Sequence, residues 1–160
     1  MSGAPLLHVC FVCSFNRARS VIAEVIFSEQ LHKRGLGDVV RVSSAGTVAI
    51  DGAPIDHRTA AVLVKHGYPA SAMHCARRVN DDHLSADLVV TFGYEQARIL
   101  QQRGVGNERI RCAPVRNPSS SNAFESALTA IECALPSVHS WVAASRAVSA
   151  SAEPRCGRVM

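Results

Sequence analysis

The sequence predicts an α/β fold in which helices pack on both faces of a parallel β-sheet. Strand-like and helix-like segments alternate along the chain, and such alternation is typical of parallel sheets. The strand-like segments are short aliphatic runs, whereas apolar residues recur at helical spacing in the helix-like segments. A chain of 160 residues with 48% hydrophobic and 19% charged residues has the length and composition of one globular domain.

The first half of the chain is predicted to contain two strands and two helices. Apolar runs of strand length occupy residues 6–13 and 39–43, and residues 45–47 are predicted to form a turn. Helical spacing of apolar residues predicts a helix over 19–33, and a second predicted helix, 54–64, opens with proline, which suits a first turn. Glycines follow both segments, where a left-handed residue ends a helix at little cost.

The second half continues the same alternation. Residues 80–82 resemble a helix cap, and residues 86–92 form the clearest buried strand because β-branched residues occupy its centre. A helix is expected over 94–103, where Gly104 ends it, and a short strand over 110–113.

The C-terminal third begins with a loop. Residues 114–122 are rich in Pro, Ser and Asn, and a long helix follows from about residue 123, with Pro136 expected to kink or break it. Beyond residue 146 Ser, Ala, Glu and Pro dominate without periodicity, so we expect a single domain over residues 1–146 and a disordered tail over 147–160.

Charge and hydropathy exclude several classes of protein. The balance of 17 Lys and Arg against 13 Asp and Glu gives a net charge of +4, which is consistent with an anionic substrate. The basic residues form no stripe of the kind that binds nucleic acid. No apolar stretch has the length of a membrane span, and no signal peptide is recognisable, so a cytoplasmic protein is expected.

The cysteines do not indicate a disulfide framework or a metal site. A chain of this length can be stabilised by its core alone, and most of the cysteines lie in apolar or helical contexts. Cys10 and Cys13 form a CxxC inside a predicted strand, which places their sulfurs on opposite faces, and no second pair is available for zinc. We therefore expect no metal and no cofactor.

The predicted chemistry lies where the first strand meets the first helix. Cys13 ends the strand and Arg19 begins the helix, so the backbone N–H groups between them can converge on one oxyanion. The positive end of the helix favours a thiolate at Cys13, Ser20 can donate a hydrogen bond to it, and Arg19 can clamp the anion. A thiolate, a nest of amides and a guanidinium are the groups needed to attack a phosphate.

This junction resembles the signature of the low-molecular-weight protein tyrosine phosphatases. The sequence FVCSFNRARSVIAE at residues 11–24 matches the family's FVCxGNxCRSPxAE at most positions. The likeness extends over about residues 6–142, and includes VSSAGT at 42–47, GAPIDHR at 52–58, KHGYP at 65–69, HCAR at 74–77, ADLVV at 86–90, and the Phe-Glu and Ile-Glu pairs at 124–125 and 131–132. The resemblance implies a three-layer sandwich with a four-stranded parallel sheet, of the phosphotyrosine protein phosphatase I type, and a cysteinyl-phosphate intermediate formed without metal.

The resemblance also implies a role for each site residue. Cys13 corresponds to the nucleophile and Arg19 to the arginine that clamps the phosphate. The expected substrate is a phosphorylated protein or a small phosphate ester, and inorganic phosphate or sulfate should bind in the same loop. The residues expected to surround the phosphate are Cys13, Ser14, Phe15, Asn16, Arg17, Ala18, Arg19 and Ser20, and those expected to support the loop are Asn16, Ser20, Ser44 and His74.

The sequence departs from the family inside this loop. Phe15 and Ala18 replace the usual glycine and second cysteine, and Val21 replaces the usual proline. Without the second cysteine, Cys13 has no disulfide partner within the loop. Phe15 is bulky where the backbone approaches the ligand, so it is expected either to distort the loop or to form a wall beside it.

A larger departure affects the general acid. The family carries Asp-Pro-Tyr-Tyr in a second loop, where the aspartic acid protonates the leaving group and the tyrosines flank the substrate ring. The aligned residues here are Asn-Pro-Ser-Ser at 117–120. Because an amide is not an acid, Asn117 is a degenerate acid position, and its loss is worth about 10²–10⁴-fold in rate. Asp82 and Glu125 are possible substitutes, although no motif directs either toward the site.

Three functions are compatible with this sequence. The first is a phosphatase that hydrolyses phosphate monoesters, impaired at Asn117; the second is a non-catalytic binder of phosphate or phosphoproteins. The third is an arsenate reductase, because that branch shares the ADLVVT run at residues 86–91. Its relay cysteines are missing at Gly93 and over residues 96–102, so Cys75 or Cys112 would have to replace them.

Overall fold

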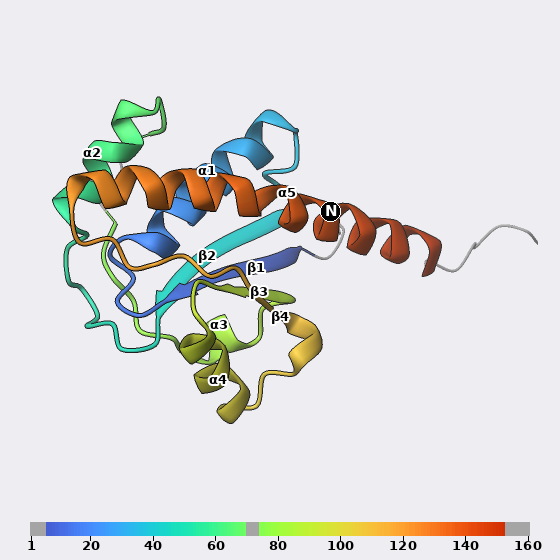
Figure 1. Ribbon diagram of the computed structural model, residues 1–160. Helices are drawn as coiled ribbons and strands as arrows, with labels where there is room; N and C mark the ends of the chain where they lie inside the picture. Colours follow the sequence, from blue (N-terminus) through green and yellow to red (C-terminus); the bar gives the residue numbers. More distant parts are fainter. Residues whose placement is uncertain (1–5, 70–73, 153–160) are drawn as a thin grey trace, which may run out of the picture.

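The computed structural model describes residues 6–69 and 74–152, and these form a three-layer α/β sandwich (Figure 1). Its sheet has four parallel strands in the order β2-β1-β3-β4. The predicted four-stranded parallel sheet is therefore confirmed. The strands are β1 Leu7–Cys13, β2 Val40–Gly46, β3 Leu88–Thr91 and β4 Ile110–Cys112.

Helices cover both faces of the sheet. Helices α1, α2 and α5 lie on one side of it in Figure 1, and α3 and α4 lie on the other. The helices are α1 Arg19–Lys33, α2 His57–Lys65, α3 Asp81–Leu84, α4 Tyr94–Gln102 and α5 Ser121–Ala152, with a short 3₁₀ turn, η1, at Asn107–Arg109. None of the helices in the described residues is long and apolar enough to cross a membrane.

The core is divided by the sheet into two apolar clusters. The larger cluster lies between the sheet and helices α1 and α5, and it includes Val9, Phe11 and Cys13 from β1. The smaller cluster lies on the opposite face and includes Cys10 and Val12. The alternation of side chains along β1 thus places Cys10 and Cys13 on opposite faces of the sheet, as the CxxC spacing predicts.

Two predicted element boundaries are wrong: strand pairing explains the first, and a local helix cap explains the second. Residues 45 and 46 lie not in a turn but in β2, where they pair with Val12 and Cys13 of β1. The second helix begins at His57 rather than at Pro54, because the Asp56 side chain accepts a hydrogen bond from the Arg58 backbone N–H and so caps α2.

Helix α5 is longer than the sequence pattern predicts. It passes through Pro136, which is exposed, without a break. A proline removes one backbone hydrogen bond from a helix, but the apolar face of α5 remains packed on the core through Leu135 and Val138. Residues 147–152 are helical rather than irregular, and the rest of the expected tail, 153–160, lies outside the described residues.

Candidate active site

The loop between β1 and α1 turns back over the end of β1. Asn16 is fully buried and has a φ of 54°, a left-handed conformation that asparagine tolerates better than most residues. Its backbone N–H donates to Cys13 Sγ at 3.3 Å. No side chain caps α1 at Ala18, so the first amides of this helix remain available to an anion.

The Cys13 thiol is buried at the floor of this loop. Its Sγ lies 3.0 Å from Ser20 Oγ, and only 2% of the residue is exposed. Ser20 Oγ also accepts a hydrogen bond from Asn16 Nδ2 at 2.8 Å, which leaves the serine hydrogen free to donate to sulfur. Two donors, the Asn16 N–H and the Ser20 hydroxyl, therefore point at Cys13 Sγ.

Arg19 places a buried positive charge beside that sulfur. Its Nη1 donates to the Val115 carbonyl at 2.9 Å and to the Phe92 carbonyl at 3.4 Å. Within the described residues Arg19 forms no salt bridge, and its buried Nε has no hydrogen-bond partner. Burial lowers the pKa of Arg19 and the charge of Cys13 opposes that shift, but a guanidinium stays protonated in proteins. An oxyanion bound here would supply the missing partner.

A polar network supports the loop from behind. Asn16 Nδ2 donates to Ser44 Oγ at 2.9 Å, and Asn16 Oδ1 accepts from His74 Nε2 at 3.1 Å and from the Arg77 backbone N–H at 3.0 Å. The structure therefore brings together Asn16, Ser20, Ser44 and His74, the four residues expected to support the loop.

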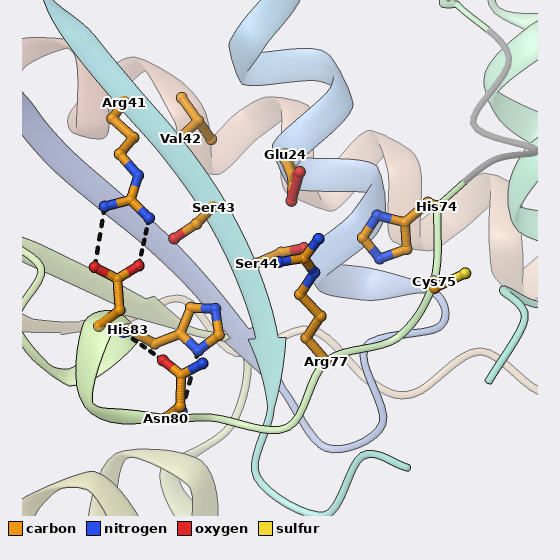
Figure 2. A pocket seen from close by; sticks show the side chains of 11 residues that line it. Glu24, Arg41, Val42, Ser43, Ser44, His74, Cys75, Arg77, Asn80 and His83 are labelled. Carbon is orange, nitrogen blue, oxygen red and sulfur yellow. Dashed lines mark hydrogen bonds and ion pairs between the residues drawn. The ribbon is translucent and has the colours of Figure 1, made fainter. Parts of the chain in front are cut away.

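A cavity of about 430 Å³ lies on the far side of this network. Figure 2 shows Glu24, Ser44, His74 and Arg77 converging at one end of it. Burial raises the pKa of Glu24, whereas the hydrogen bond from Ser44 and the charge of Arg77 lower it. The carboxylate thus contributes to the environment of Ser44, which in turn contacts Asn16.

Gly46 permits the tight approach of β2 to the loop, a role that the sequence did not reveal. A Cβ on this residue would lie 2.5 Å from the Ser14 carbonyl oxygen and 2.8 Å from the Asn16 nitrogen. Immediately after it, the Thr47 N–H donates to the Cys13 carbonyl at 3.0 Å, and the Val48 N–H donates to the Ser14 carbonyl at 2.9 Å. The sequence signal is a glycine at a strand end, which is equally typical of the turn predicted there.

A second cavity, of about 330 Å³, opens above Cys13. Phe15 lines it with 51% of its surface exposed, so this ring forms a wall of the opening and does not fill the loop. Asn117, the residue predicted to be a degenerate acid position, lines the same cavity as Cys13 and Arg19. The other lining residues are Arg17, Ala18, Asp56, Arg58, Pro118, Ser119 and Phe124.

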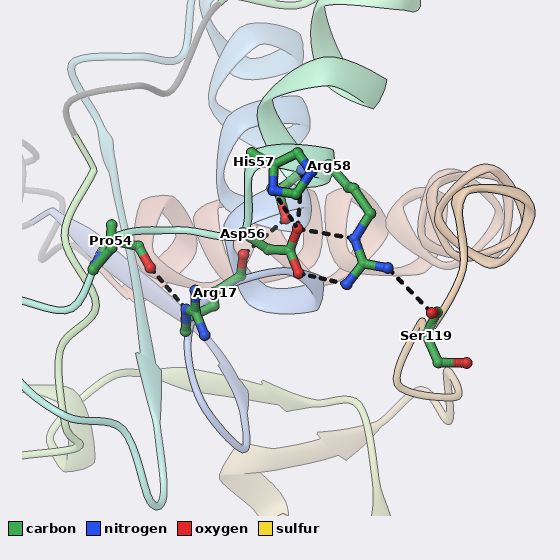
Figure 3. A network of polar contacts seen from close by, with 7 residues as sticks. Arg17, Pro54, Asp56, His57, Arg58 and Ser119 are labelled. Carbon is green, nitrogen blue, oxygen red and sulfur yellow. Dashed lines mark hydrogen bonds and ion pairs between the residues drawn. The ribbon is translucent and has the colours of Figure 1, made fainter.

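Asp56 is a carboxylate in this cavity that the sequence motifs did not single out. Figure 3 shows it paired with Arg58, whose Nε donates to Oδ1 at 3.1 Å and whose Nη2 donates to Oδ2 at 2.8 Å. This pairing lowers the pKa of Asp56 to about 2, so the carboxylate is ionised at neutral pH. Its sequence signal is the cap position before α2, which does not by itself indicate a neighbouring cavity.

The family model for low molecular weight phosphotyrosine protein phosphatases matches residues 8–146. The chain belongs to this family. A protein from Mycobacterium tuberculosis described as low molecular weight protein-tyrosine phosphatase A is 43% identical over 151 residues, which cover 85% of this chain and 91% of that protein. A low molecular weight protein-tyrosine-phosphatase of Streptomyces coelicolor is 41% identical over 97 residues, or 59% of this chain and 58% of that protein.

Solved structures agree with this assignment at the level of the fold. A YwlE mutant from Bacillus subtilis superimposes with a TM-score of 0.76 at 21% identity, covering 85% of this chain and 98% of that structure. The predicted family is therefore confirmed, together with the predicted class of enzyme, a hydrolase of the protein-tyrosine-phosphatase type.

The two acids considered as substitutes have other partners in this low molecular weight phosphatase. Asp82 pairs with Arg41, and Glu125 accepts from Lys65 Nζ at 2.7 Å and contacts His66 Nε2 at 2.5 Å. Neither carboxylate lines the cavity above Cys13. The structure therefore does not support Asp82 or Glu125 as a proton donor at this site.

Proposed function

We propose that this phosphatase hydrolyses phosphate monoesters, with phosphotyrosine in proteins as the natural substrate class, through a cysteinyl phosphate at Cys13. The observation that carries the proposal is the arrangement around Cys13 Sγ: a buried thiol with two hydrogen-bond donors, beside a buried arginine that has no acidic partner among the described residues. A buried arginine without an anionic partner destabilises the fold, and a bound phosphate dianion would offset this cost.

The first chemical step follows from this geometry. The phosphate oxygens accept hydrogen bonds from the loop amides and from Arg19 Nε, which places phosphorus next to Cys13 Sγ. The thiolate attacks phosphorus, the S–P bond forms and the bond from phosphorus to the leaving oxygen breaks. Arg19 and the amides stabilise the negative charge on the transferring group throughout this step.

The leaving oxygen then needs a proton, and the cavity supplies none. The Asn117 amide is not acidic, and Arg58 keeps Asp56 ionised. The departing phenolate must therefore take its proton from water, at a cost of about 10²–10⁴-fold in rate for a poor leaving group. Esters of acidic phenols need little protonation, so they should be the best substrates.

In the second step, water attacks phosphorus, the S–P bond breaks and the thiolate is restored. The proton lost by water goes to solvent or to the released phosphate. Arg19 and the loop amides hold the same three phosphate oxygens as in the first step, so the two steps share one set of stabilising contacts.

A burst assay with p-nitrophenyl phosphate tests this proposal. Wild type should release nitrophenol with a burst followed by turnover, and Cys13→Ser should release none. Asn117→Asp should raise turnover of a phosphotyrosine peptide about tenfold or more, and turnover of p-nitrophenyl phosphate by a smaller factor, because only the poor leaving group depends on the acid.

The same assay distinguishes the alternatives. Phosphate binding by folded wild type without any turnover of p-nitrophenyl phosphate would refute the catalytic proposal and favour a phosphate-binding protein. Thiol-dependent reduction of arsenate would favour the reductase. The structure gives arsenate reduction little support, because Cys13 is the only cysteine among the described residues that lines the cavity. Cys10 lies on the opposite face of the sheet, where burial raises the pKa of its thiol to about 12.

A further inference from the structure

We propose that Arg17 makes the rim of the cavity a subsite for a second anion, so that the preferred substrates are phosphotyrosines flanked by aspartate or glutamate. This inference rests on the proposed function and concerns the same cavity. The resemblance gives Arg17 only as one residue of the phosphate loop, at a variable position of the signature, and the proposal adds a role for its side chain.

Arg17 is held in place by hydrogen bonds at its backbone and at its side-chain Nε. Its carbonyl oxygen accepts hydrogen bonds from the Asp56 N–H at 3.1 Å and from Thr59 Oγ1 at 2.7 Å. Its Nε donates to the Pro54 carbonyl at 2.7 Å, as Figure 3 shows. An arginine fixed in this way loses little conformational freedom when it binds a ligand.

The terminal nitrogens of Arg17 remain available. Among the described residues they make no hydrogen bond, and Arg17 forms no salt bridge. The residue is exposed and lines the cavity above Cys13. Its guanidinium can therefore form two parallel hydrogen bonds with a carboxylate that approaches from solvent.

The charges of the cavity leave Arg17 as the unmatched cation at its rim. Three arginines and one carboxylate line the cavity. Arg58 takes both oxygens of Asp56, so this pair is close to neutral toward a ligand. Arg19 is buried beside Cys13 and serves the phosphate that reacts. The remaining positive charge, on Arg17, calls for a second negative group on the same substrate.

The form of the cavity indicates an aryl phosphate within a peptide. Phe15 presents half of its surface at the opening, and an aromatic wall suits the ring of phosphotyrosine. A cavity of about 330 Å³ admits the phosphorylated side chain but not the residues that flank it. Those residues must lie on the rim, where Arg17 is exposed.

The experiment compares two phosphotyrosine peptides that differ only in having Glu or Gln beside the phosphotyrosine. Wild type should favour the Glu peptide in kcat/KM by about five- to tenfold at low salt, with less preference at high salt. In Arg17→Gln this ratio should fall to about one. Arg17→Lys should keep part of the preference, because it retains the charge but not the paired geometry. Arg98→Gln, which removes an exposed charge from α4 outside the cavity, should keep all of it.

Affinity measurements make the result independent of turnover. Both peptides are titrated into Cys13→Ser, with and without the change at Arg17, and the ratio of dissociation constants is compared with the kinetic ratio. Equal affinity for the two peptides, or an unchanged ratio in folded Arg17→Gln, would overturn the inference. If wild type does not hydrolyse p-nitrophenyl phosphate, the proposed catalysis is refuted. The ratio of the two dissociation constants would still decide the role of Arg17.

Discussion

Two segments face each other across the cavity above Cys13, and they differ in burial and in the hydrogen bonds of their side chains. In the loop that carries Cys13, the residues Cys13, Asn16 and Arg19 are buried, and each polar group of the Asn16 side chain has a partner. The 114–120 segment opposite is mostly exposed and is held chiefly through its backbone, by Arg19 at Val115 and by Arg58 at Ser119. Under the proposed mechanism, the first segment carries the groups for attack on phosphorus, whereas the second carries Asn117 at the position where an acid would assist the leaving group.

This contrast separates two contributions to catalysis. Stabilising charge on a phosphoryl group requires fixed donors, and such donors need a rigid and buried scaffold. Proton donation requires only one acid of suitable pKa within reach. The second contribution can therefore disappear through one substitution, as we propose for Asn117, while the first is retained. Substitutions at three further positions test the contrast, and the expected effects decrease from Gly46 through Gln96 to Asp56.

Replacing Gly46 by alanine should displace the loop that carries Cys13 and cause the largest loss of activity. The added Cβ would lie 2.5 Å from the Ser14 carbonyl oxygen, so β2 and the loop must separate. Displacement of the loop by even 1 Å should lower kcat/KM for p-nitrophenyl phosphate by about 10²-fold or more. Gly37→Ala is the matched control, since its Cβ would meet its nearest atom only at 3.9 Å. A Gly46→Ala protein of normal activity would contradict the role assigned to this close approach.

Replacing Gln96 by alanine should have an intermediate effect. Gln96 Nε2 donates to Ser14 Oγ at 2.7 Å, and Ser14 Oγ also accepts from Arg19 Nη2 at 3.5 Å. Loss of the glutamine frees Ser14 and loosens Arg19, so kcat/KM should fall by about three- to tenfold, the value of roughly one hydrogen bond.

The control for this experiment is Gln102→Ala, an exposed residue of the same helix. Because Gln96 acts through Ser14, the double variant Gln96→Ala, Ser14→Ala should lose little more than Ser14→Ala alone. Additive losses would show that Gln96 acts independently of Ser14.

The smallest effect should come from Asp56→Asn, measured as stability against pH. The folded-state pKa of Asp56 is about 2, below its ordinary value of 3.8, so its pairing with Arg58 stabilises the fold above pH 4. This contribution is lost as the pH falls from about 4 to 2. The free energy of unfolding in urea should therefore fall less over this interval in Asp56→Asn, which keeps the helix cap, than in wild type.

Asp38→Asn, an exposed carboxylate that precedes β2, is the control for that titration. It should follow the wild-type pH dependence. Identical pH dependence in wild type and Asp56→Asn would mean that the pair with Arg58 does not stabilise the folded state.

Several features of this protein could be predicted from contiguous residues. The alternation of strands and helices, the opposite faces of Cys10 and Cys13, and the junction at which β1 meets α1 all follow from local side-chain periodicity. The family motif placed Asn16, Ser44 and His74 in one network, and the structure brings them within hydrogen-bonding distance. The predictions of elements and faces agree with the structure because each depends on a short pattern, and the supporting role of the network stays a prediction.

The layered architecture and the position of Cys13 and Arg19 around one turn of backbone follow from the amino-acid sequence alone. Three other features depend on the folded chain: Gly46 ends a strand against the loop, Arg58 joins α2 to Ser119, and Arg17 is fixed by Pro54. The partners in each of these contacts lie between about 30 and 60 residues apart in the chain. Periodicity and capping act over a few neighbouring residues, whereas these contacts exist only after the packing of the sheet has brought distant loops to the same edge.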